Sequence, residues 1–232
     1  MTPTIVVSIV LGALLFLVIL LICAVEAAKK VRQKPSERHR IPKGKGEMGE
    51  TYVARILQRC CQNEYDHLMN NVILYDPHRK SSCEIDHIFI GPHGVFVIET
   101  KNRAGKIFGD DEHDEWTQVL ADGSLIHTMR SPVLQNETHV RFLEQILYRR
   151  VSESIPVTGL VVFVRGNTQN IQSSSVCTPF QLSQRLEQDG HHITPAEQER
   201  AYRTLRAHLE RYPITKEQHL QYIRSRHPNE QD

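Results

Sequence analysis

A long uncharged apolar run near the N-terminus constrains this chain more than any other feature. Residues 5–25 contain no Asp, Glu, Lys or Arg, and 16 of these 21 positions are Ile, Leu, Val or Phe. As a helix the run spans roughly 32 Å, close to the thickness of a bilayer's hydrocarbon core. We therefore predict a transmembrane anchor over residues 1–28, embedded in the lipid bilayer through residues 5–25. A cleaved signal peptide is the alternative, but it would carry basic residues before a shorter apolar core.

The segment after this run predicts the orientation of the anchor. Residues 26–45 hold eight Lys or Arg residues and two Glu residues. Basic residues beside a span stay in the cytoplasm. We expect a single-pass protein of a bacterial inner membrane, with the N-terminus outside and the body of the chain cytoplasmic. Residues 29–45 would form a basic linker, which can also contact anionic lipid.

Cysteine usage and net charge narrow the possible functions of the body. The five cysteines are odd in number and include no CxxC pair, which argues against a disulfide framework or a zinc site. The formal net charge of +1 argues against a broad basic surface for nucleic acid, although a local cleft remains possible. Nothing in the sequence identifies a protein partner.

Apolar periodicity predicts an α/β fold with a central mixed sheet flanked by helices. We expect one domain over residues 46–170 and a C-terminal helical extension over residues 171–232. The expected strands are 71–75, 83–90, 95–101 and 157–164, with a hairpin-rich excursion over 105–128. The expected helices are 47–61, 131–149, 180–188, 194–212 and 215–226, of which 194–212 opens with a capping box.

Two of these strands flank Gly91-Pro92-His93-Gly94, whose composition predicts a hairpin turn. The predicted register pairs Ile90 with Val95, Ile88 with Val97, Asp86 with Glu99, and Glu84 with Lys101. Because side chains alternate along a strand, Asp86, Glu99 and Lys101 would then share one face. His87 would point to the other face, so it is a weak ligand candidate.

Two carboxylates at opposed positions repel each other and require a cation nearby. Lys101 could supply that charge, and a divalent metal held by Asp86 and Glu99 would supply more, since hard cations prefer carboxylate oxygens. The alternative is an ordinary Glu–Lys pair at a strand end.

Polar side chains on two helices extend this candidate site. Glu50 shares the buried side of its helix with Val53 and Leu57, although acids in a first turn also interact favourably with the helix dipole. Gln135 and His139 lie on one face of a later helix, where Gln135 could contact a phosphate or water. His139 alone would more often be a satisfied histidine beside a core.

Several motifs together resemble the nuclease-related domain (NERD) family. They are Gly46-Glu47-Met48-Gly49-Glu50, Glu84-Ile85-Asp86, Gly94-Val95-Phe96-Val97-Ile98-Glu99-Thr100-Lys101 and Pro132-Val133-Leu134-Gln135-Asn136 followed by His139. The region around Gly105, Gly109 and Trp116 resembles the family's usual insertion. The resemblance covers roughly residues 46–164, and residues after about 171 match no familiar pattern.

This family is similar to the PD-(D/E)xK restriction-endonuclease-like nucleases. The resemblance implies a restriction-endonuclease-like fold and Mg²⁺- or Mn²⁺-dependent hydrolysis of phosphodiester bonds in DNA or RNA. It implies Asp86 and Glu99 as metal ligands and Lys101 as the group that orients water or neutralises phosphate. Glu50 would be an auxiliary acid and Gln135 an auxiliary polar contact.

Two other functions remain open from the sequence. The domain could bind nucleic acid or a protein without turnover, since a motif does not establish a rate. Alternatively, the chain could be a membrane scaffold whose partner binds the C-terminal helices, although a solvated helical surface is the simpler interpretation of that region.

Overall fold

The computed structural model describes residues 44–120, 123, 126–148 and 155–226. The predicted transmembrane segment lies outside these residues, as does the basic linker up to residue 43. In the part of the chain that is described, no helix is both long and apolar enough to cross a membrane.

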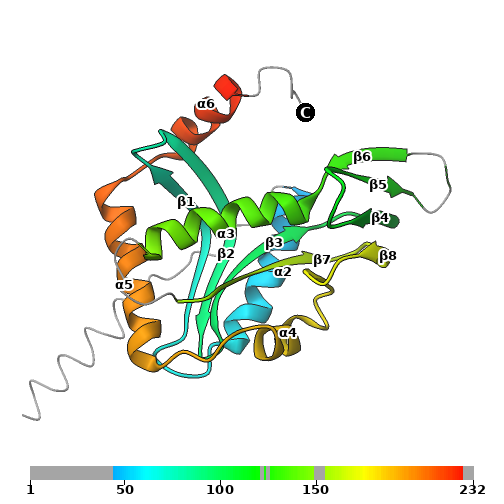
Figure 1. Ribbon diagram of the computed structural model, residues 1–232. Coiled ribbons are helices and arrows are strands. Elements are labelled where there is room, and N and C mark those ends of the chain that lie inside the picture. Colours follow the sequence, from blue (N-terminus) through cyan, green and yellow to red (C-terminus); the bar gives the residue numbers. More distant parts are fainter. Residues whose placement is uncertain (1–43, 121–122, 124–125, 149–154, 227–232) are drawn as a thin grey trace, which may run out of the picture. The chain divides into compact units, whose positions relative to one another are not determined.

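The main sheet is mixed, as the sequence predicts (Figure 1). In the described residues its strands run in the order β1 (His67–Asp76), β2 (Ser81–Gly91), β3 (Gly94–Lys101), β7 (Val157–Phe163) and β9 (Val176–Cys177). Strands β1, β2 and β3 are antiparallel neighbours, whereas β3, β7 and β9 are parallel. Strand β1 is longer than predicted, because its first residues pair with the turn-proximal end of β2.

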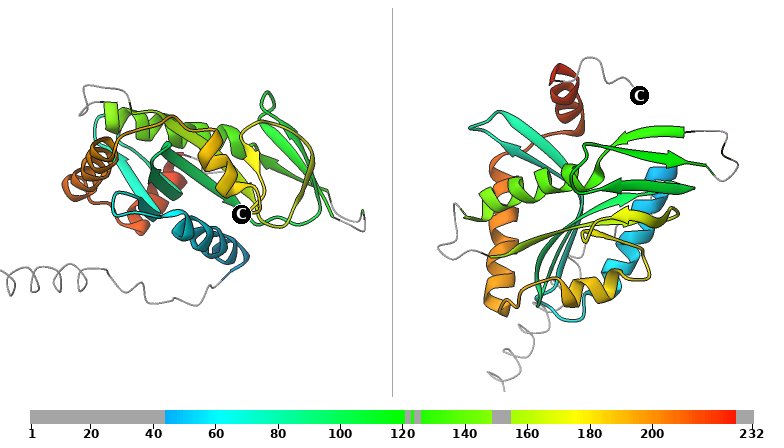
Figure 2. Two further views of the ribbon diagram at one scale, coloured as in Figure 1. Left: turned by 90° about the horizontal axis from the view of Figure 1, so that it is seen from below. Right: turned by 45° about the vertical axis from the view of Figure 1, so that its right-hand side comes forward.

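Helices cover both faces of this sheet, with the layers seen most clearly in Figure 2. On one face α3 (Pro132–Tyr148) and α5 (Pro195–Arg211) pack against Val95 and Val97 of β3. On the other face α2 (Lys45–Cys60) and α4 (Leu182–Gln188) pack against Phe96 and Ile98. Consecutive residues of β3 thus point alternately into two hydrophobic cores, as strand geometry requires.

The excursion after β3 forms part of another sheet. Its strands run in the order β6 (Ile126–Arg130), β5 (Glu115–Val119), β4 (Lys106–Asp110) and β8 (Asn167–Gln172). The hairpins predicted for residues 105–128 are present, but the parallel pairing of β8 with β4 was not predicted. Trp116 is fully buried and stacks on Phe163 with ring centroids 6.2 Å apart, so it is a packing anchor.

The C-terminal residues continue the same architecture. Thr194 and Glu197 form the predicted capping box at the start of α5. Ala201 and Leu205 of α5 are fully buried in the core beneath α3. Helix α6 (Lys216–Arg226) contacts β2.

The β2–β3 hairpin has the predicted register near its turn, with Ile90 paired to Val95 and Ile88 to Val97. The ladder ends at the His87–Ile98 pair, so the predicted pairing of Asp86 with Glu99 is wrong. The ladder between β1 and β2 is also interrupted at Asp86, opposite Asn71, whose φ of 52° is left-handed.

The alternation of β2 shifts by one residue at this interruption. Ile88 and Ile90, at even-numbered positions, face the core under α3 and α5. Cys83 and Ile85 face the same core from odd-numbered positions. A strand that alternated without a break could not place both pairs on one side. Asp86 therefore lies at a kink where β2 leaves β3.

Candidate active site

Glu99, Lys101 and Gln135 meet where β3 ends and α3 begins. Lys101 Nζ donates hydrogen bonds to Oε1 of Glu99 at 2.7 Å and to Oε1 of Gln135 at 3.0 Å. Nε2 of Gln135 donates to the same Glu99 oxygen at 3.1 Å. Glu99 and Lys101 share a face of β3 because they are two residues apart, and Gln135 reaches them from the first turn of α3.

Asp86 approaches this cluster from the kink in β2. Its Oδ2 accepts a 2.8 Å hydrogen bond from the main-chain amide of Thr100, the residue between Glu99 and Lys101. The side chain of Asp86 thus takes the place of the next rung of the β2–β3 ladder. Asp86 is drawn to the end of β3 by this bond, and not by the cross-strand pairing that the sequence predicted.

Glu84 lies elsewhere than predicted. It was expected opposite Lys101, but the β2–β3 ladder does not extend that far. Instead, Glu84 Oε1 accepts a 2.8 Å hydrogen bond from Lys216 Nζ of α6, and its Oε2 lies 3.9 Å from His219 Nε2. Because β2 kinks, Glu84 lies beside α6, and Lys101 pairs with Glu99 instead.

Glu50 lies beside the cluster but is not hydrogen-bonded to Asp86, Glu99, Lys101 or Gln135 within the described residues. Burial raises the pKa of Glu50, and the negative charges of Glu84 and Glu99 add to that effect. Helix α2 comes close to β3 at Gly49, where an added Cβ would lie 2.7 Å from Cβ of Asn102. The absence of a side chain at Gly49 allows the helix to bring Glu50 near the acids.

His139 lies one turn along α3 from Gln135, at the inner wall of the site. It is 7% exposed, and its Nδ1 is 3.6 Å from Oε2 of Glu99. Burial lowers the pKa of His139, and the nearby carboxylate of Glu99 only partly opposes that effect. The neutral ring is therefore favoured, and its Nδ1 has no hydrogen-bond partner among the described residues.

His87 supports the site from the other face of the sheet, a role that the sequence did not reveal. Its Nδ1 lies 2.7 Å from Oδ1 of Asn70, and its Nε2 lies 3.1 Å from Oγ1 of Thr100. Burial lowers the pKa of His87 to about 4, so the ring is neutral near pH 7. Thr100 therefore bonds His87 through its side chain and Asp86 through its main chain.

The acids give the site an excess of negative charge. Burial raises the pKa of Asp86 well above its usual range, and the charge of Glu99 raises it further. Lys101 lies near both acids and only partly offsets their repulsion. Such an arrangement favours either a shared proton or a bound cation.

A groove of about 820 Å³ reaches the site at Asp86, Gln135 and His139, which line it. One wall is the face of α3 that carries Gln135 and His139, and another is α6 with His219, Tyr222 and Ile223. Asp86 of β2 also lines the groove. The sequence predicted the α3 wall from its periodicity, but it gave no signal that α6 would fold back beside β2.

Arginines on the rim offset the charge of the interior. Arg79, Arg130 and Arg141 all line the groove and are exposed. Arginines in such positions contact phosphates of any sequence. The net charge of the chain concealed this local arrangement, since acids and bases are close to balance overall.

The acid pair suits only certain metals. Within the described residues, no group of three or more His, Cys, Asp and Glu side chains is arranged to hold an ion. Mg²⁺ typically takes only one or two carboxylates and keeps several waters or substrate oxygens. The donor set of Asp86 and Glu99 therefore fits Mg²⁺ or Mn²⁺, whereas a structural zinc site would need more protein ligands.

Helices cover both faces of a mixed sheet, and at one strand end the buried acid Glu99 and the half-buried acid Asp86 lie beside Lys101. This fold and site define an α/β domain with a cluster of acids and a lysine at the end of a strand. The sequence model of the nuclease-related domain, NERD, matches residues 45–164. The chain belongs to this family.

Two further comparisons found similar proteins. It is 32% identical over 123 residues to an uncharacterised protein of Bacillus anthracis, and the match covers 53% of this chain and 54% of that protein. The chain thus spans about half the length of this relative. The small subunit of a heterodimeric restriction endonuclease aligns with a TM-score of 0.30 and 14% identity, covering 78% of this chain and 89% of that subunit.

Proposed function

We propose that this protein is a membrane-anchored, metal-dependent nuclease that hydrolyses phosphodiester bonds of DNA or RNA. The observation that carries the proposal is the meeting of Asp86, Glu99 and Lys101 at the end of β3, beside a groove with an arginine-lined rim. Membership of the nuclease-related family supports the same conclusion.

Asp86 and Glu99 would hold the divalent ion. Oδ2 of Asp86 is bonded to Thr100, and Oε1 of Glu99 to Lys101 and Gln135. Oδ1 of Asp86 and Oε2 of Glu99 accept no hydrogen bond from the described residues, so each acid keeps an oxygen for an ion. A bound Mg²⁺ or Mn²⁺ would supply Lewis acidity at the phosphate and lower the pKa of a bound water.

The residues of the chain itself would bind and orient the substrate. Lys101, with 22% of its side chain exposed, presents a positive charge where negative charge grows on the phosphate. Gln135 holds both Lys101 and Glu99 and so fixes their relative positions. Glu50 and His139 would act from the edge of the site, as auxiliary polar groups near the acids.

The location of the protein is a separate part of the proposal. The apolar run over residues 5–25 would anchor the chain in the inner membrane, and the basic residues after it would keep the domain cytoplasmic. Fractionation of cells expressing the full chain should find it in the membrane pellet after a high-salt wash. Recovery in the soluble fraction would contradict the anchor.

The test of the activity uses the full-length chain purified in mild detergent. It should cleave labelled DNA or RNA with Mg²⁺ or Mn²⁺ and not with EDTA. Glu99→Ala should abolish cleavage, whereas Glu210→Ala, at a surface position of α5 whose side chain is 70% exposed, should retain it. Equal cleavage by Glu99→Ala and the wild type would exclude the proposed site.

A domain that binds without turnover is the second candidate. Lys101 and Gln135 already occupy Oε1 of Glu99, so the acid is partly satisfied without an ion. Such a domain would serve as a nucleic-acid- or protein-binding scaffold at the cytoplasmic face of the membrane. Calorimetric titration that detects Mn²⁺ binding, with no cleavage of any DNA or RNA substrate, would favour it.

A further inference from the structure

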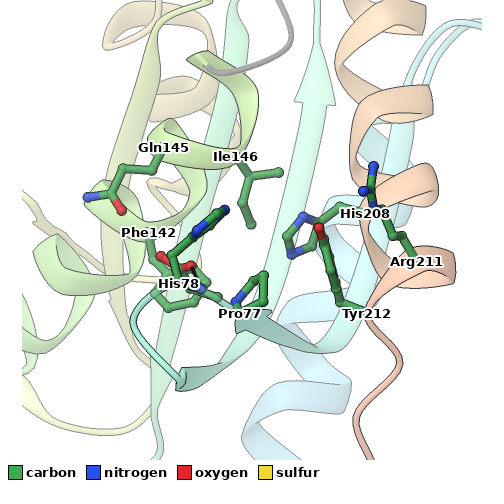
Figure 3. A pocket seen from close by; sticks show the side chains of 9 residues that line it. Pro77, His78, Phe142, Gln145, Ile146, His208, Arg211 and Tyr212 are labelled. Atoms are coloured by element: carbon green, nitrogen blue, oxygen red, sulfur yellow. Dashed lines mark hydrogen bonds between the residues drawn. The ribbon is translucent and has the colours of Figure 1, made fainter.

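A second cavity lies farther along α3, between that helix, the β1–β2 turn and the C-terminal end of α5. It has a volume of about 570 Å³, within the roughly 300 to 1,000 Å³ of typical small-molecule sites. Figure 3 shows His208 and Arg211 of α5, with Tyr212 directly after that helix, on one side and Phe142 and Gln145 of α3 on the other. The β1–β2 turn contributes His78.

This cavity adjoins the groove described above. Phe142 and Gln145 line both of them, and the neighbouring turn residues His78 and Arg79 line one each. Gln145 follows Gln135 by ten positions, which corresponds to roughly 15 Å along a helix at 1.5 Å per residue. Stacked nucleotides at about 3.4 Å each would span this distance with roughly four nucleotides.

The side chains at and just after the C-terminal end of α5 suit a nucleotide. The Arg211 guanidinium lies 5.4 Å from the centroid of the Tyr212 ring, and the His208 ring is 5.1 Å from the same ring. His208 is held in place because its Nε2 lies 2.9 Å from the carbonyl oxygen of Tyr75. Aromatic rings stack on bases of any sequence, and an exposed arginine binds phosphate.

The acid in this cavity does not oppose an anionic ligand strongly. Asp76 is 6% exposed, and its Oδ1 accepts hydrogen bonds from the main-chain amides of His78 at 2.8 Å and Arg79 at 3.4 Å. Its Oδ2 lies 4.0 Å from Nε of Arg79. The carboxylate of Asp76 is therefore occupied by hydrogen bonds within the turn, which reduce its repulsion of an anionic ligand.

We propose that this cavity is a subsite for an unpaired nucleotide, so that the protein acts on single-stranded nucleic acid or on an unpaired end. The inference rests on the proposed nuclease function, since it takes the strand to run from the acid cluster along α3. A base in an intact duplex is stacked and paired and cannot enter a recessed site without being extruded. A single strand meets no such barrier.

The test measures binding in EDTA, so that it does not depend on cleavage. The full-length chain is titrated against fluorescein-labelled single-stranded DNA, the same sequence as RNA, and a matched blunt duplex, with fluorescence anisotropy as the readout. Tyr212→Ala and Arg211→Ala should each weaken single-strand binding about tenfold, in line with the loss of a stacked base or a phosphate contact. Binding to the duplex should be unchanged.

Two variants serve as controls. Tyr212→Phe keeps the ring and should bind as the wild type does. Arg206→Ala removes a different arginine of α5, whose side chain is 53% exposed and paired with Glu210, and should leave binding unchanged. Circular dichroism on each variant establishes that α5 is folded.

The outcomes separate this inference from the proposed function. Unchanged single-strand binding by Tyr212→Ala and Arg211→Ala would overturn the subsite, whether or not the wild type cleaves. Equal losses on duplex and single strand would overturn the assignment to single strands. Binding that depends on Tyr212 and Arg211, with no cleavage under any metal condition, would support the subsite and reject the nuclease.

Discussion

The main-chain amide of Thr100 donates a 2.8 Å hydrogen bond to the side chain of Asp86, at the point where strands β2 and β3 separate. In a regular hairpin that amide would bond to a main-chain carbonyl of the neighbouring strand. Here β2 turns away from β3 at its kink, and the carboxylate of Asp86 accepts the hydrogen bond in place of that carbonyl. One interruption of the sheet therefore satisfies the amide of β3 and also brings an acid to the end of that strand.

The left-handed backbone at Asn71 is expected to maintain this kink. Its φ of 52° is tolerated by Asn or Gly but brings the Cβ of a branched residue too close to the backbone. Asn71→Val should lower the free energy of unfolding by about 1–2 kcal/mol, and Asn71→Gly should not. Urea denaturation followed by circular dichroism would measure both. Equal stability of the two variants would argue against strain at this position.

The two bonds made by Thr100 can be separated by mutation. Thr100→Val removes the hydroxyl that bonds Nε2 of the buried His87 but keeps the amide that bonds Asp86. It should cost about 1–3 kcal/mol of stability, as an unsatisfied buried group does, yet retain nuclease activity. Thr100→Ser keeps the hydroxyl and should therefore keep both the stability and the nuclease activity of the wild type. Loss of activity in a folded Thr100→Val protein would mean that the hydroxyl, too, positions the site.

The sequence predicted the parts of the site that depend on local repetition. The four-residue turn between the apolar strands 83–90 and 95–101 was sufficient to predict the hairpin register near Ile90 and Val95. Helical spacing likewise placed Gln135 and His139 on one face of α3. These features follow from the length of a turn and the period of a helix, and both can be read directly from the order of the residues.

The parts that were missed depend on distant segments or on one unusual residue. The alternation of β2 changes at Asp86, opposite the left-handed Asn71 of β1, and no count along the strand reveals this change. The partner of Glu84 is Lys216, which is 132 positions away. Strand β8 pairs with β4 although Asn167 follows its partner Lys106 by about 60 positions. Such contacts are decided by how whole elements pack. The sequence therefore could not show that the β2–β3 ladder ends before Asp86 and Glu99.

Metal binding should stabilise the folded chain through the acid pair. A ligand that binds only the native state adds about 2.7 kcal/mol when its concentration is 100 times its Kd. Thermal unfolding with Mn²⁺ should therefore shift to higher temperature in the wild type and not in Asp86→Asn. Glu84→Gln is the matched control, because that acid pairs with Lys216 outside the predicted ligand set. An equal shift in all three proteins would place the ion elsewhere.

Cys83 should make the protein sensitive to alkali. Burial raises the pKa of its thiol to about 12, whereas an unfolded thiol titrates near roughly 8.5. Between these values the unfolded chain releases a proton that the folded chain keeps, so stability is present at lower pH and falls as the pH rises. The expected slope from this thiol is about 1.4 kcal/mol per pH unit.

Cys83→Ser, which cannot ionise in this range, should reduce that slope when unfolding is measured in urea from pH 9 upward. Val72→Ala removes methyl groups from the same hydrophobic core without removing a titrating group. It should lower stability by a similar amount at every pH. A slope that is the same in Cys83→Ser and the wild type would contradict the role of this thiol.

The close approach of α2 to β3 predicts opposite effects at two glycines of one helix. Replacing Gly by Ala inside a helix usually stabilises it by roughly 0.5–1 kcal/mol. At Gly46 the added Cβ would lie 3.7 Å from Oε1 of Glu50, an ordinary contact, so Gly46→Ala should show this gain. At Gly49 it would lie 2.7 Å from Cβ of Asn102, so α2 must move away from the end of β3.

Gly49→Ala should therefore be less stable than the wild type and should cleave more slowly, because Glu50 is the next residue and moves with the helix. Glu50→Gln separates the two causes, since it changes the charge while leaving the packing intact. If Glu50 contributes through its charge near Asp86 and Glu99, this variant should lose activity without losing stability. Normal cleavage by Glu50→Gln, with slow cleavage by Gly49→Ala, would instead assign the effect to the packing of α2 against β3.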